Sequence, residues 1–350
     1  MHLVRPRRRR PVPVGLVAVV AVLVTVVGGW LVRLLAHRPP SPADHGPPPA
    51  GSRTVLTEDG VPLHVELDGD PRAAFTVVLV HGFTARLGEF DRQRAALRDR
   101  ARLVLYDHRG HGRSGWGDVR HATIDQLGRD LSRVLDAVVP DGPVVLVGHS
   151  MGGMTVMALA EQRPELFGPR VVGVALLATS AGRLTEVGPG ARFVSLLVRL
   201  HLLRLYLRLL RWIAPLLERA RRRGSGAGRA FTRRYLFGRE DATPQAVRQV
   251  QDMLEETPFT IAAAFYPTFI DHDKERALAA LRDLPVLVLD GADDRLTPAW
   301  HSRLLAEGIG PSAELVVVPG AGHSVNFTRP DLVDAALRRL LERAERAAAA

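Results

Sequence analysis

Residues 144–153 read Val-Val-Leu-Val-Gly-His-Ser-Met-Gly-Gly, and this stretch decides the fold. The apolar run Val144–Val147 is typical of a strand that is buried on both faces of a sheet. Gly148-His-Ser150-Met-Gly152 then fits the G-x-S-x-G pattern, and a helical run follows it directly. A serine on so tight a turn needs small residues two positions before and two positions after it, and both are glycine here. We therefore predict a strand, a sharp turn that carries Ser150, and a helix.

A serine hydroxyl is a weak nucleophile at neutral pH and needs a base beside it. Among the 13 histidines of the chain, His323 stands out because its loop directly follows the apolar run Leu315–Val318. A loop histidine at the carboxyl end of a strand can reach back over the sheet. The competing interpretation is an exposed loop histidine without a catalytic role. We predict that His323 is the general base for Ser150.

The base needs a carboxylate that orients its ring. Residues 290–298 read Asp-Gly-Ala-Asp-Asp-Arg-Leu-Thr-Pro after the apolar run Val286–Leu289, so three aspartates compete for this role. We expect Asp290 at the strand end, before the glycine turn. Asp294 stands after the turn and is our candidate, with Asp293 as the alternative. The resulting chain order of serine, aspartate and histidine distinguishes one triad fold from the unrelated ones.

The negative charge that develops on the substrate oxygen needs two preorganised N–H donors. Met151 follows the nucleophile at the start of a helix, so its backbone N–H is one candidate. The second should come from the loop after the apolar run Thr76–Val80, which reads His81-Gly-Phe-Thr84, and Phe83 is the best placed residue in it. Such a mechanism requires neither a metal ion nor an organic cofactor, and we predict none.

Short apolar runs alternate with helical patterns from about residue 52 onward, which predicts a mostly parallel sheet with helices on both faces. The expected strands are 53–57, 63–67, 76–80, 103–106, 144–147, 171–177, 286–289 and 315–318. The expected helices are 88–99, 124–138, 151–163, 299–307 and 330–347. The long interval between residues 177 and 286 reads as helical throughout. Because it leaves the carboxyl end of a strand, where ligands bind in such sheets, we predict a helical lid over the site.

The chain resembles the α/β-hydrolase fold superfamily of serine hydrolases. The matching segments occur in the family order and are VLVHGF (78–83), YDHRGHGRS (106–114), VGHSMGG (147–153), GADDRLTP (291–298) and GAGH (320–323). The combination of GHSMGG with HGF is also similar to monoacylglycerol lipases and to actinobacterial esterases. The resemblance implies an eight-stranded, mostly parallel sheet and a Ser-His-Asp acyl-enzyme mechanism. It does not specify the substrate, because esterases, lipases, haloperoxidase-like enzymes and peptidases share these segments, and we expect the cleavage of carboxylic esters.

The resemblance also assigns residues outside the triad. Asp107–Ser114 is similar to a family turn after the fourth strand, so we interpret His108 and His111 as structural. Relatives that cleave epoxides or carbon–halogen bonds carry an aspartate nucleophile. This chain has Ser150 at that position, which argues against those activities.

The N-terminal residues 14–32 are uncharged and apolar. A helix of this length can cross a bilayer. The basic run at residues 7–10 precedes them and should stay cytoplasmic, which places the catalytic region on the outer side. A cleaved signal peptide is the alternative. We favour an uncleaved signal anchor, because the apolar run exceeds the usual length of a signal peptide and no clear A-x-A cleavage site follows it.

The composition limits which partners and metal sites are possible. The formal charge of +10 comes with arginine clusters that border apolar stretches, and without a recognition motif we expect no nucleic-acid partner. The absence of cysteine excludes disulfides and cysteine-ligated metals. The predicted division of the chain is a basic cytoplasmic N-terminus (1–13), a transmembrane anchor (14–32), a proline-rich linker (33–51), the hydrolase core (52–180 and 281–345) and the helical lid (181–280).

Within the lid, residues 191–217 are rich in leucine, and Arg204, Arg208 and Arg211 share one helical face. Such a helix either lies in a membrane interface or packs its leucines on the hydrolase body, and the sequence leaves both open. The anchor and this leucine-rich, basic lid motivate the hypothesis that the enzyme hydrolyses lipophilic esters near its membrane.

Three other functions stay open. One is a peptidase of the proline-iminopeptidase kind, in which Glu255 or Glu256 would hold the substrate amine. The second is a cofactor-free haloperoxidase or perhydrolase, which uses the same triad. The third is a non-catalytic, membrane-tethered binding protein on a hydrolase fold.

Overall fold

The computed structural model describes residues 49, 51–186, 197, 201–202, 205–206, 232–239 and 242–349. The predicted membrane anchor 14–32, the basic segment before it and nearly all of the linker after it lie outside these residues. So does most of the leucine-rich stretch 191–217, including Arg204, Arg208 and Arg211. None of the helices in the described part of the chain combines the length and the apolar character that a membrane span requires.

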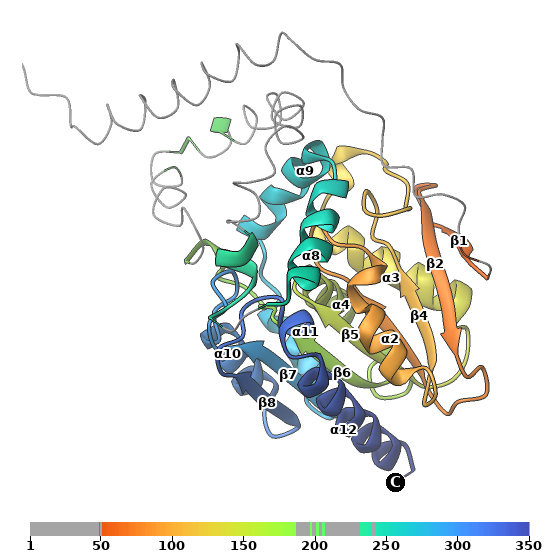
Figure 1. Ribbon diagram of the computed structural model, residues 1–350. Helices are drawn as coiled ribbons and strands as arrows, with labels where there is room; N and C mark the ends of the chain where they lie inside the picture. The colour runs from red at the N-terminus through yellow and green to blue at the C-terminus, as the bar shows by residue number, and fades with distance from the viewer. Residues whose placement is uncertain are drawn as a thin grey trace, which may run out of the picture.

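An eight-stranded sheet forms the centre of the molecule, with the strand order β1-β2-β4-β3-β5-β6-β7-β8 (Figure 1). The first two strands run antiparallel to their neighbours, and the six others are parallel. The bounds are β1 Arg53–Leu56, β2 Pro62–Gly69, β3 Thr76–Val80, β4 Arg102–Tyr106, β5 Val144–His149, β6 Val171–Leu177, β7 Val286–Gly291 and β8 Ala313–Val318. The predicted eight-stranded, mostly parallel sheet is confirmed.

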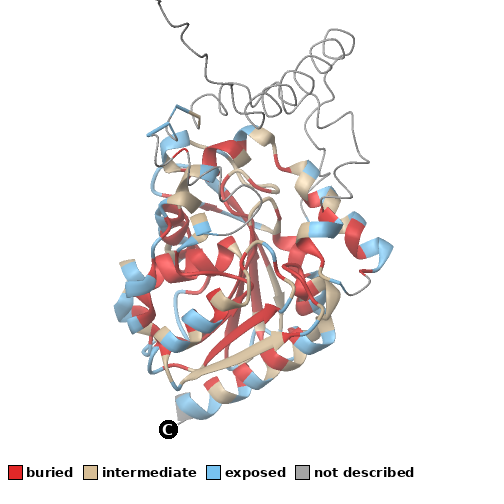
Figure 2. Cartoon of the chain, turned by 90° about the vertical axis from the view of Figure 1, so that its left-hand side faces the viewer, coloured by how far each residue is buried: buried red, intermediate tan, exposed pale blue. Residues whose placement is uncertain are grey.

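Helices cover both faces of the sheet. On one face α2 (Asp91–Leu97) and α12 (Pro330–Ala349) pack on the central strands. On the other face lie α3 (Ile124–Val138), α4 (Met151–Gln162) and α10 (Trp300–Ile309). The central strands β3, β5, β6 and β7 are buried along their whole length, as expected for strands covered on both sides (Figure 2).

The shorter elements connect these layers. They are the 3-10 turns Leu87–Phe90, Val119–His121, Pro164–Leu166, Leu184–Glu186 and Glu275–Leu281, and the one-turn helix α11 (Val325–Thr328). Between β6 and β7 the described residues include the helices α8 (Pro244–Glu256) and α9 (Phe259–Ile270). Thr243 caps α8 through its hydroxyl, which accepts the N–H of Ala246, and Pro244 occupies the first turn, where its missing N–H costs no hydrogen bond.

Two strands run further than their apolar residues suggest. β5 includes Gly148 and His149, and β7 includes Asp290 and Gly291. The pairing explains the extension, because His149 stays in register with Leu177 of β6. Backbone pairing in a parallel sheet does not depend on side-chain polarity, so these polar residues end their strands at the edge where the site is built.

Candidate active site

Ser150 occupies a strained turn between β5 and α4. Its backbone angles are φ 52° and ψ −118°, a region that residues with side chains rarely adopt. The glycines around it are required by space, since a Cβ on Gly152 would lie 1.9 Å from the carbonyl oxygen of Val80. A Cβ on Gly148 would lie 2.5 Å from backbone atoms of the following turn. The predicted strand, turn and helix around Ser150 are therefore present.

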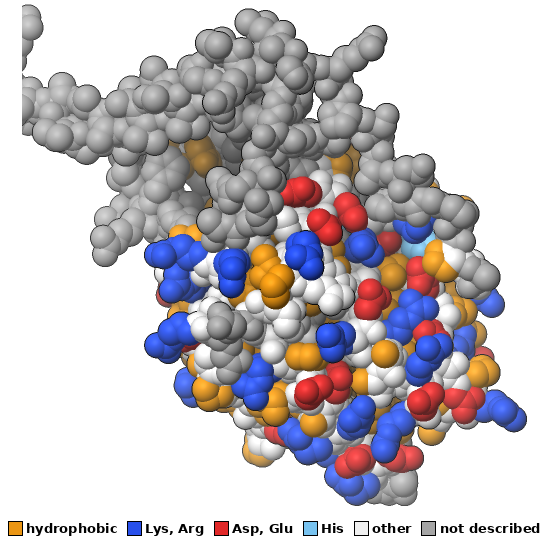
Figure 3. All heavy atoms as spheres, viewed as in Figure 1, with side chains coloured by type: hydrophobic (Ala, Val, Ile, Leu, Met, Phe, Trp, Pro, Cys, Tyr) orange, Lys and Arg blue, Asp and Glu red, His pale blue; other side chains and the backbone are white. Residues whose placement is uncertain are grey.

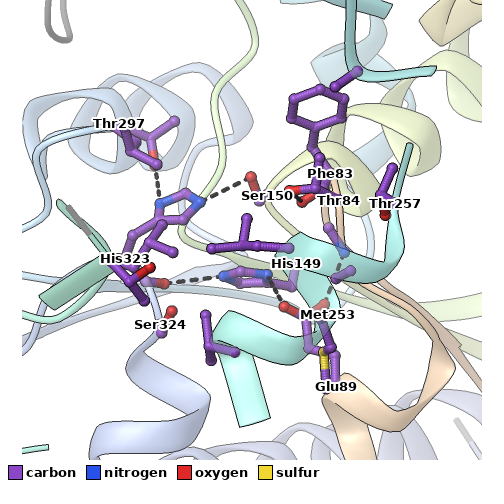
Figure 4. A pocket seen from close by; sticks show the side chains of 18 of the residues that line it. Phe83, Thr84, Glu89, His149, Ser150, Met253, Thr257, Thr297, His323 and Ser324 are labelled. Atoms are coloured by element: carbon purple, nitrogen blue, oxygen red, sulfur yellow. Dashed lines mark hydrogen bonds and ion pairs between the residues drawn. The ribbon is translucent and has the colours of Figure 1, made fainter. Parts of the chain in front are cut away.

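The structure brings Ser150, His323 and Asp294 into one hydrogen-bonded chain, of which Figure 4 shows His323 facing Ser150. His323 Nε2 lies 2.9 Å from Ser150 Oγ, and His323 Nδ1 lies 2.7 Å from Asp294 Oδ2. The imidazole is therefore oriented by the carboxylate on one side and faces the serine hydroxyl on the other. All three side chains come from the carboxyl ends of parallel strands, where the loops after β5, β7 and β8 converge.

The Asp294 carboxylate is buried but well supplied with donors. Its Oδ1 accepts the backbone N–H groups of Leu296 at 2.7 Å and Thr297 at 3.0 Å, and the Thr297 hydroxyl lies 2.9 Å from Oδ2. Burial alone would raise the pKa of Asp294, but the His323 ring and these donors outweigh it and lower the pKa. The group is thus ionised and suited to stabilise a positively charged His323.

The two competing aspartates are bound elsewhere. Asp293 pairs with the Arg239 guanidinium at 2.8 Å. Asp290 is fully buried, and it accepts the N–H of Gly291 at 2.7 Å and the hydroxyl of Ser302 at 2.8 Å. Burial and the nearby negative charge of Asp294 raise the pKa of Asp290 well above its usual value. Of the three aspartates, the structure places Asp294 against His323.

The loop after β3 lies beside the serine. A Cβ on Gly82 would come within 3.3 Å of Ser150 Cβ, and the Gly82 carbonyl accepts the N–H of Ala85 at 3.3 Å in a tight turn. This turn carries Phe83 and the strained Thr84, whose φ is 54°. Met151 is the first residue of α4, so its N–H has no acceptor within the helix. Of the two predicted oxyanion donors, Met151 thus follows Ser150 in the chain, and Phe83 belongs to the turn that lies beside Ser150 in space.

The histidines that end β3 and β4 form a buried cluster. His108 donates its backbone N–H to His81 Nε2 at 2.9 Å, and its ring lies 3.0 Å from the His81 carbonyl oxygen. His111 Nδ1 lies 3.0 Å from the Arg109 carbonyl oxygen. Burial lowers the pKa of His108 to about 3 and that of His111 to about 4, so both rings are neutral. Their contacts agree with the structural role that we interpret for them.

A cavity of about 660 Å³ opens onto Ser150 and His323. Most of its wall is apolar and includes residues of α8 and α9; examples are Met154, Leu184, Leu236, Val250, Met253 and Phe269. No lysine or arginine is among the described residues that line it. A cavity of this size and character suits a neutral, apolar group of a small-molecule ligand.

Sequence reasoning missed two residues that shape the site. Glu89 is buried beside the serine and holds the backbone N–H of Gly82 at 2.7 Å. Thr297 contacts both Asp294 and, at 3.3 Å, His323 Nδ1. Thr297 was recognisable only as a helix start, and Glu89 lies in a 3-10 turn without any motif. Both act through tertiary contacts that no local pattern reveals.

Comparison with known proteins settles the family. A family model described as "Alpha/beta hydrolase family" matches residues 77–336, well over half of the chain. The chain belongs to the alpha/beta hydrolase family. The resemblance predicted from the motifs is thereby confirmed, and the protein is a hydrolase of this fold.

Several alpha/beta hydrolases are similar to it. A protein of Azorhizobium caulinodans named "Putative carbamate hydrolase RutD" is 30% identical, and the alignment covers 77% of this chain and 91% of that protein. A monoacylglycerol lipase of Mycolicibacterium smegmatis is 27% identical, with 75% and 85% covered. The solved structure of a thermophilic esterase from Thermogutta terrifontis is 27% identical, with a TM-score of 0.66 and coverage of 84% and 99%.

Proposed function

We propose that this alpha/beta hydrolase cleaves carboxylic esters of lipophilic acyl groups, with Ser150 as nucleophile. One observation carries the proposal. The hydrogen-bonded chain of Ser150, His323 and Asp294 opens onto a cavity of about 660 Å³ with a mostly apolar wall. The serine, base and carboxylate supply acyl transfer, and the cavity supplies the preference for apolar groups.

The geometry suggests the following course. Ser150 Oγ attacks the acyl carbonyl while His323 Nε2 takes its proton, and Asp294 stabilises the charged ring. The backbone N–H groups of Phe83 and Met151 donate hydrogen bonds to the developing oxyanion. The C–O bond to the alcohol then breaks, and the alcohol leaves with the proton from His323. Water, activated by the same base, attacks the acyl-enzyme and releases the acid.

The cavity favours a lipophilic ester over a carbamate. The relatives include both a protein with a carbamate hydrolase name and a monoacylglycerol lipase, so the names alone do not choose between the two. A carbamate is small and polar and would leave the apolar wall around Met154 and Phe269 without contacts. A longer acyl chain removes that wall from water, which stabilises the complex by about 25 cal/mol per Å² of apolar surface.

The aminopeptidase alternative depends on an available carboxylate. Glu256 is engaged in an ion pair with Arg86 at 2.8 Å, which leaves Glu255 as the candidate amine holder in the lid. Glu255 lines the cavity, where it accepts a hydrogen bond from Gln251. Aminoacyl amides therefore belong in the substrate panel. Peroxide-dependent activity belongs there as well, because perhydrolases use the same triad.

For the setting of the enzyme, the proposal is a membrane surface reached through an uncleaved anchor at residues 14–32, with the catalytic region outside the cytoplasm. Cationic and anionic side chains are interspersed on the face shown in Figure 3, without a broad patch of one sign. Nucleic acid is not proposed as a partner, because no recognition motif accompanies the basic residues of the sequence. The ligand is then a small ester or lipid, delivered from the membrane or from solution.

A labelling experiment with an ester series tests the proposal. A fluorophosphonate probe should label the wild type and not Ser150→Ala, whereas Ser324→Ala, which changes another serine of the cavity, should stay labelled. With p-nitrophenyl esters, kcat/KM should rise from acetate to octanoate. A higher kcat/KM for a carbamate or an aminoacyl amide, or no dependence on chain length, would contradict it.

A further inference from the structure

A second charged pair lies behind the nucleophile. Glu89 and His149 are both buried, and His149 Nδ1 lies 2.9 Å from Glu89 Oε1 (Figure 4). The other ring nitrogen, Nε2, lies 3.0 Å from the backbone carbonyl oxygen of His323. His149 directly precedes Ser150 in the chain, so the pair sits between the nucleophile and the loop of its base.

The contacts of the ring define its protonation. A carboxylate and a carbonyl oxygen are both acceptors, so both nitrogens of His149 must carry a proton for both contacts to be favourable. Burial opposes that charge, but the Glu89 carboxylate outweighs it and, with a smaller contribution from Asp294, raises the pKa of His149. The neighbouring His81 ring is neutral, because burial holds its pKa well below the usual value. The two acceptors and the raised pKa thus both favour a protonated His149 beside Glu89.

Glu89 extends the pair to a third loop. Its second oxygen, Oε2, accepts the N–H of Gly82 at 2.7 Å, at the start of the turn that carries Phe83. One carboxylate therefore connects the turn with the predicted oxyanion donor to His149, and His149 connects the nucleophile turn to the loop of His323. Three separate loops of the site meet at these two side chains.

We propose that Glu89 and His149 are positioning residues that hold the oxyanion turn, the nucleophile turn and the histidine loop in register. Both side chains line the cavity, and in this role they act on the three loops and not on the reacting atoms. The proposal rests on the proposed function of Ser150. Its rival is a buried ion pair that contributes to folding alone, as many such pairs do.

The variants Glu89→Gln and Glu89→Ala separate the two roles. Glutamine can replace each contact: its amide oxygen accepts from Gly82, its NH₂ can donate to a neutral His149 Nδ1, and His149 Nε2 still donates to the His323 carbonyl. Alanine removes both contacts, so neither the turn of Gly82 nor the ring of His149 is held by residue 89. We expect kcat of Glu89→Gln to stay within about threefold of the wild type. For Glu89→Ala we expect kcat to fall by about 10²-fold at a similar KM, since losing an oxyanion donor costs about 10²–10³.

The pH profile gives a readout that a folding role would not move. In the wild type, His149 loses a proton as the pH rises above its raised pKa. The remaining proton stays on Nδ1, where it faces the Glu89 carboxylate, so the Nε2 lone pair then faces the carbonyl oxygen of His323 and the link to the histidine loop is lost. We therefore expect kcat to fall on the alkaline side. Glu89→Gln starts from a neutral His149, so this alkaline decline should be absent.

A second buried pair provides the matched control. Glu66 lies 3.2 Å from His64 Nε2 and also pairs with Arg94, away from Ser150 on β2. Glu66→Ala should lower the urea midpoint while kcat and its pH profile stay unchanged. If Glu89→Ala fails to fold, Glu89→Gln decides: a loss of kcat beyond tenfold, or an unchanged alkaline decline, overturns the proposal.

Fluorophosphonate labelling keeps this proposal distinct from the proposed function. A wild type that is not labelled at Ser150 refutes the proposed function itself. A wild type that is labelled, beside a folded Glu89→Ala that reacts with the probe at the wild-type rate, refutes only the positioning role.

Discussion

Adjacent residues 293 and 294 show how one turn gives two identical side chains different chemistry. Asp294 points inward, where its carboxylate meets His323 and the donors of Leu296 and Thr297. Asp293 points outward to Arg239, whose side chain is 83% exposed, so this pair is largely screened by solvent. The loss of the Asp294 carboxylate should therefore lower kcat by orders of magnitude more than the loss of the Asp293 carboxylate.

We predict that Asp294→Asn lowers kcat by roughly 10³–10⁴-fold, because an amide facing Nδ1 favours the wrong tautomer of His323. Asp293→Asn is the matched control and should change kcat by less than about threefold, in line with the small contribution of an exposed ion pair. Steady-state hydrolysis of a short p-nitrophenyl ester measures both. Comparable losses in the two variants, or a larger loss in Asp293→Asn, would show that the carboxylate is misassigned.

At this scale the sequence reveals residues whose role depends on a local turn. Ser150 needs small neighbours at fixed spacing, and His323 and Asp294 each lie in the loop that follows a buried strand. The sequence alone therefore identifies their positions. Glu89 is different, because its partners Gly82 and His149 reach it only through folding. Its spacing from either residue corresponds to no known motif.

Among the elements, the ends of β3 and β4 are joined by imidazole rings. The rings of His81 and His108 meet edge to face with centroids 4.5 Å apart, and His111 lies beside them. The fold keeps these rings uncharged, whereas in the unfolded chain they would protonate near pH 6.5. The buried cluster thus links the stability of this part of the sheet to pH.

We predict that the free energy of unfolding decreases as the pH falls below 6.5. The folded pKa of His108 is about 3 and that of His111 about 4, so between pH 6.5 and 4 the unfolded chain binds protons that the native state does not. Each histidine contributes about 1.4 kcal/mol per pH unit within that window. Urea unfolding at pH 7.5 and 5.5 measures the decrease.

His111→Asn should reduce this pH dependence, since the amide can still donate to the Arg109 carbonyl but does not titrate. A variant with the same dependence as the wild type would mean that His111 is already protonated, or solvated, in the native state.

The sheet was more predictable than its insertion. Strands such as Thr76–Val80 and Val171–Leu177 are covered on both faces, so continuous apolar runs mark them with the correct bounds. The helices α8 and α9 were expected only as part of a helical interval. Their placement over the cavity depends on contacts such as the Arg86–Glu256 pair, which joins residues 170 positions apart.

At the scale of the whole molecule, the predicted anchor bears on where in the cell the described hydrolase body acts. The predicted anchor at residues 14–32 lies outside the described residues, and the body begins with β1 at Arg53. We expect the predicted anchor to hold this body at the membrane, because the described sheet and its helices form buried hydrophobic cores without residues 14–32.

We predict that the full-length protein sediments with membranes and resists extraction by carbonate, while detergent releases it. A chain that starts at residue 50 should stay in the supernatant and hydrolyse a short ester with unchanged kcat. Protease added to intact cells should digest the catalytic region if it faces outward. Recovery of the full-length protein in the supernatant, with its N-terminus trimmed after the apolar segment, would instead identify a cleaved signal peptide.

The backbone conformation of Ser150 has a consequence for how such a chain evolves. Its positive φ costs on the order of 1–3 kcal/mol, a sizeable part of the roughly 5–15 kcal/mol that holds an ordinary domain together. Glycine adopts the same conformation without penalty. Selection for durability and selection for turnover therefore oppose each other at this one position. A lineage that no longer depends on catalysis would become more stable if glycine replaced Ser150. The stability gained would then select against a return to serine.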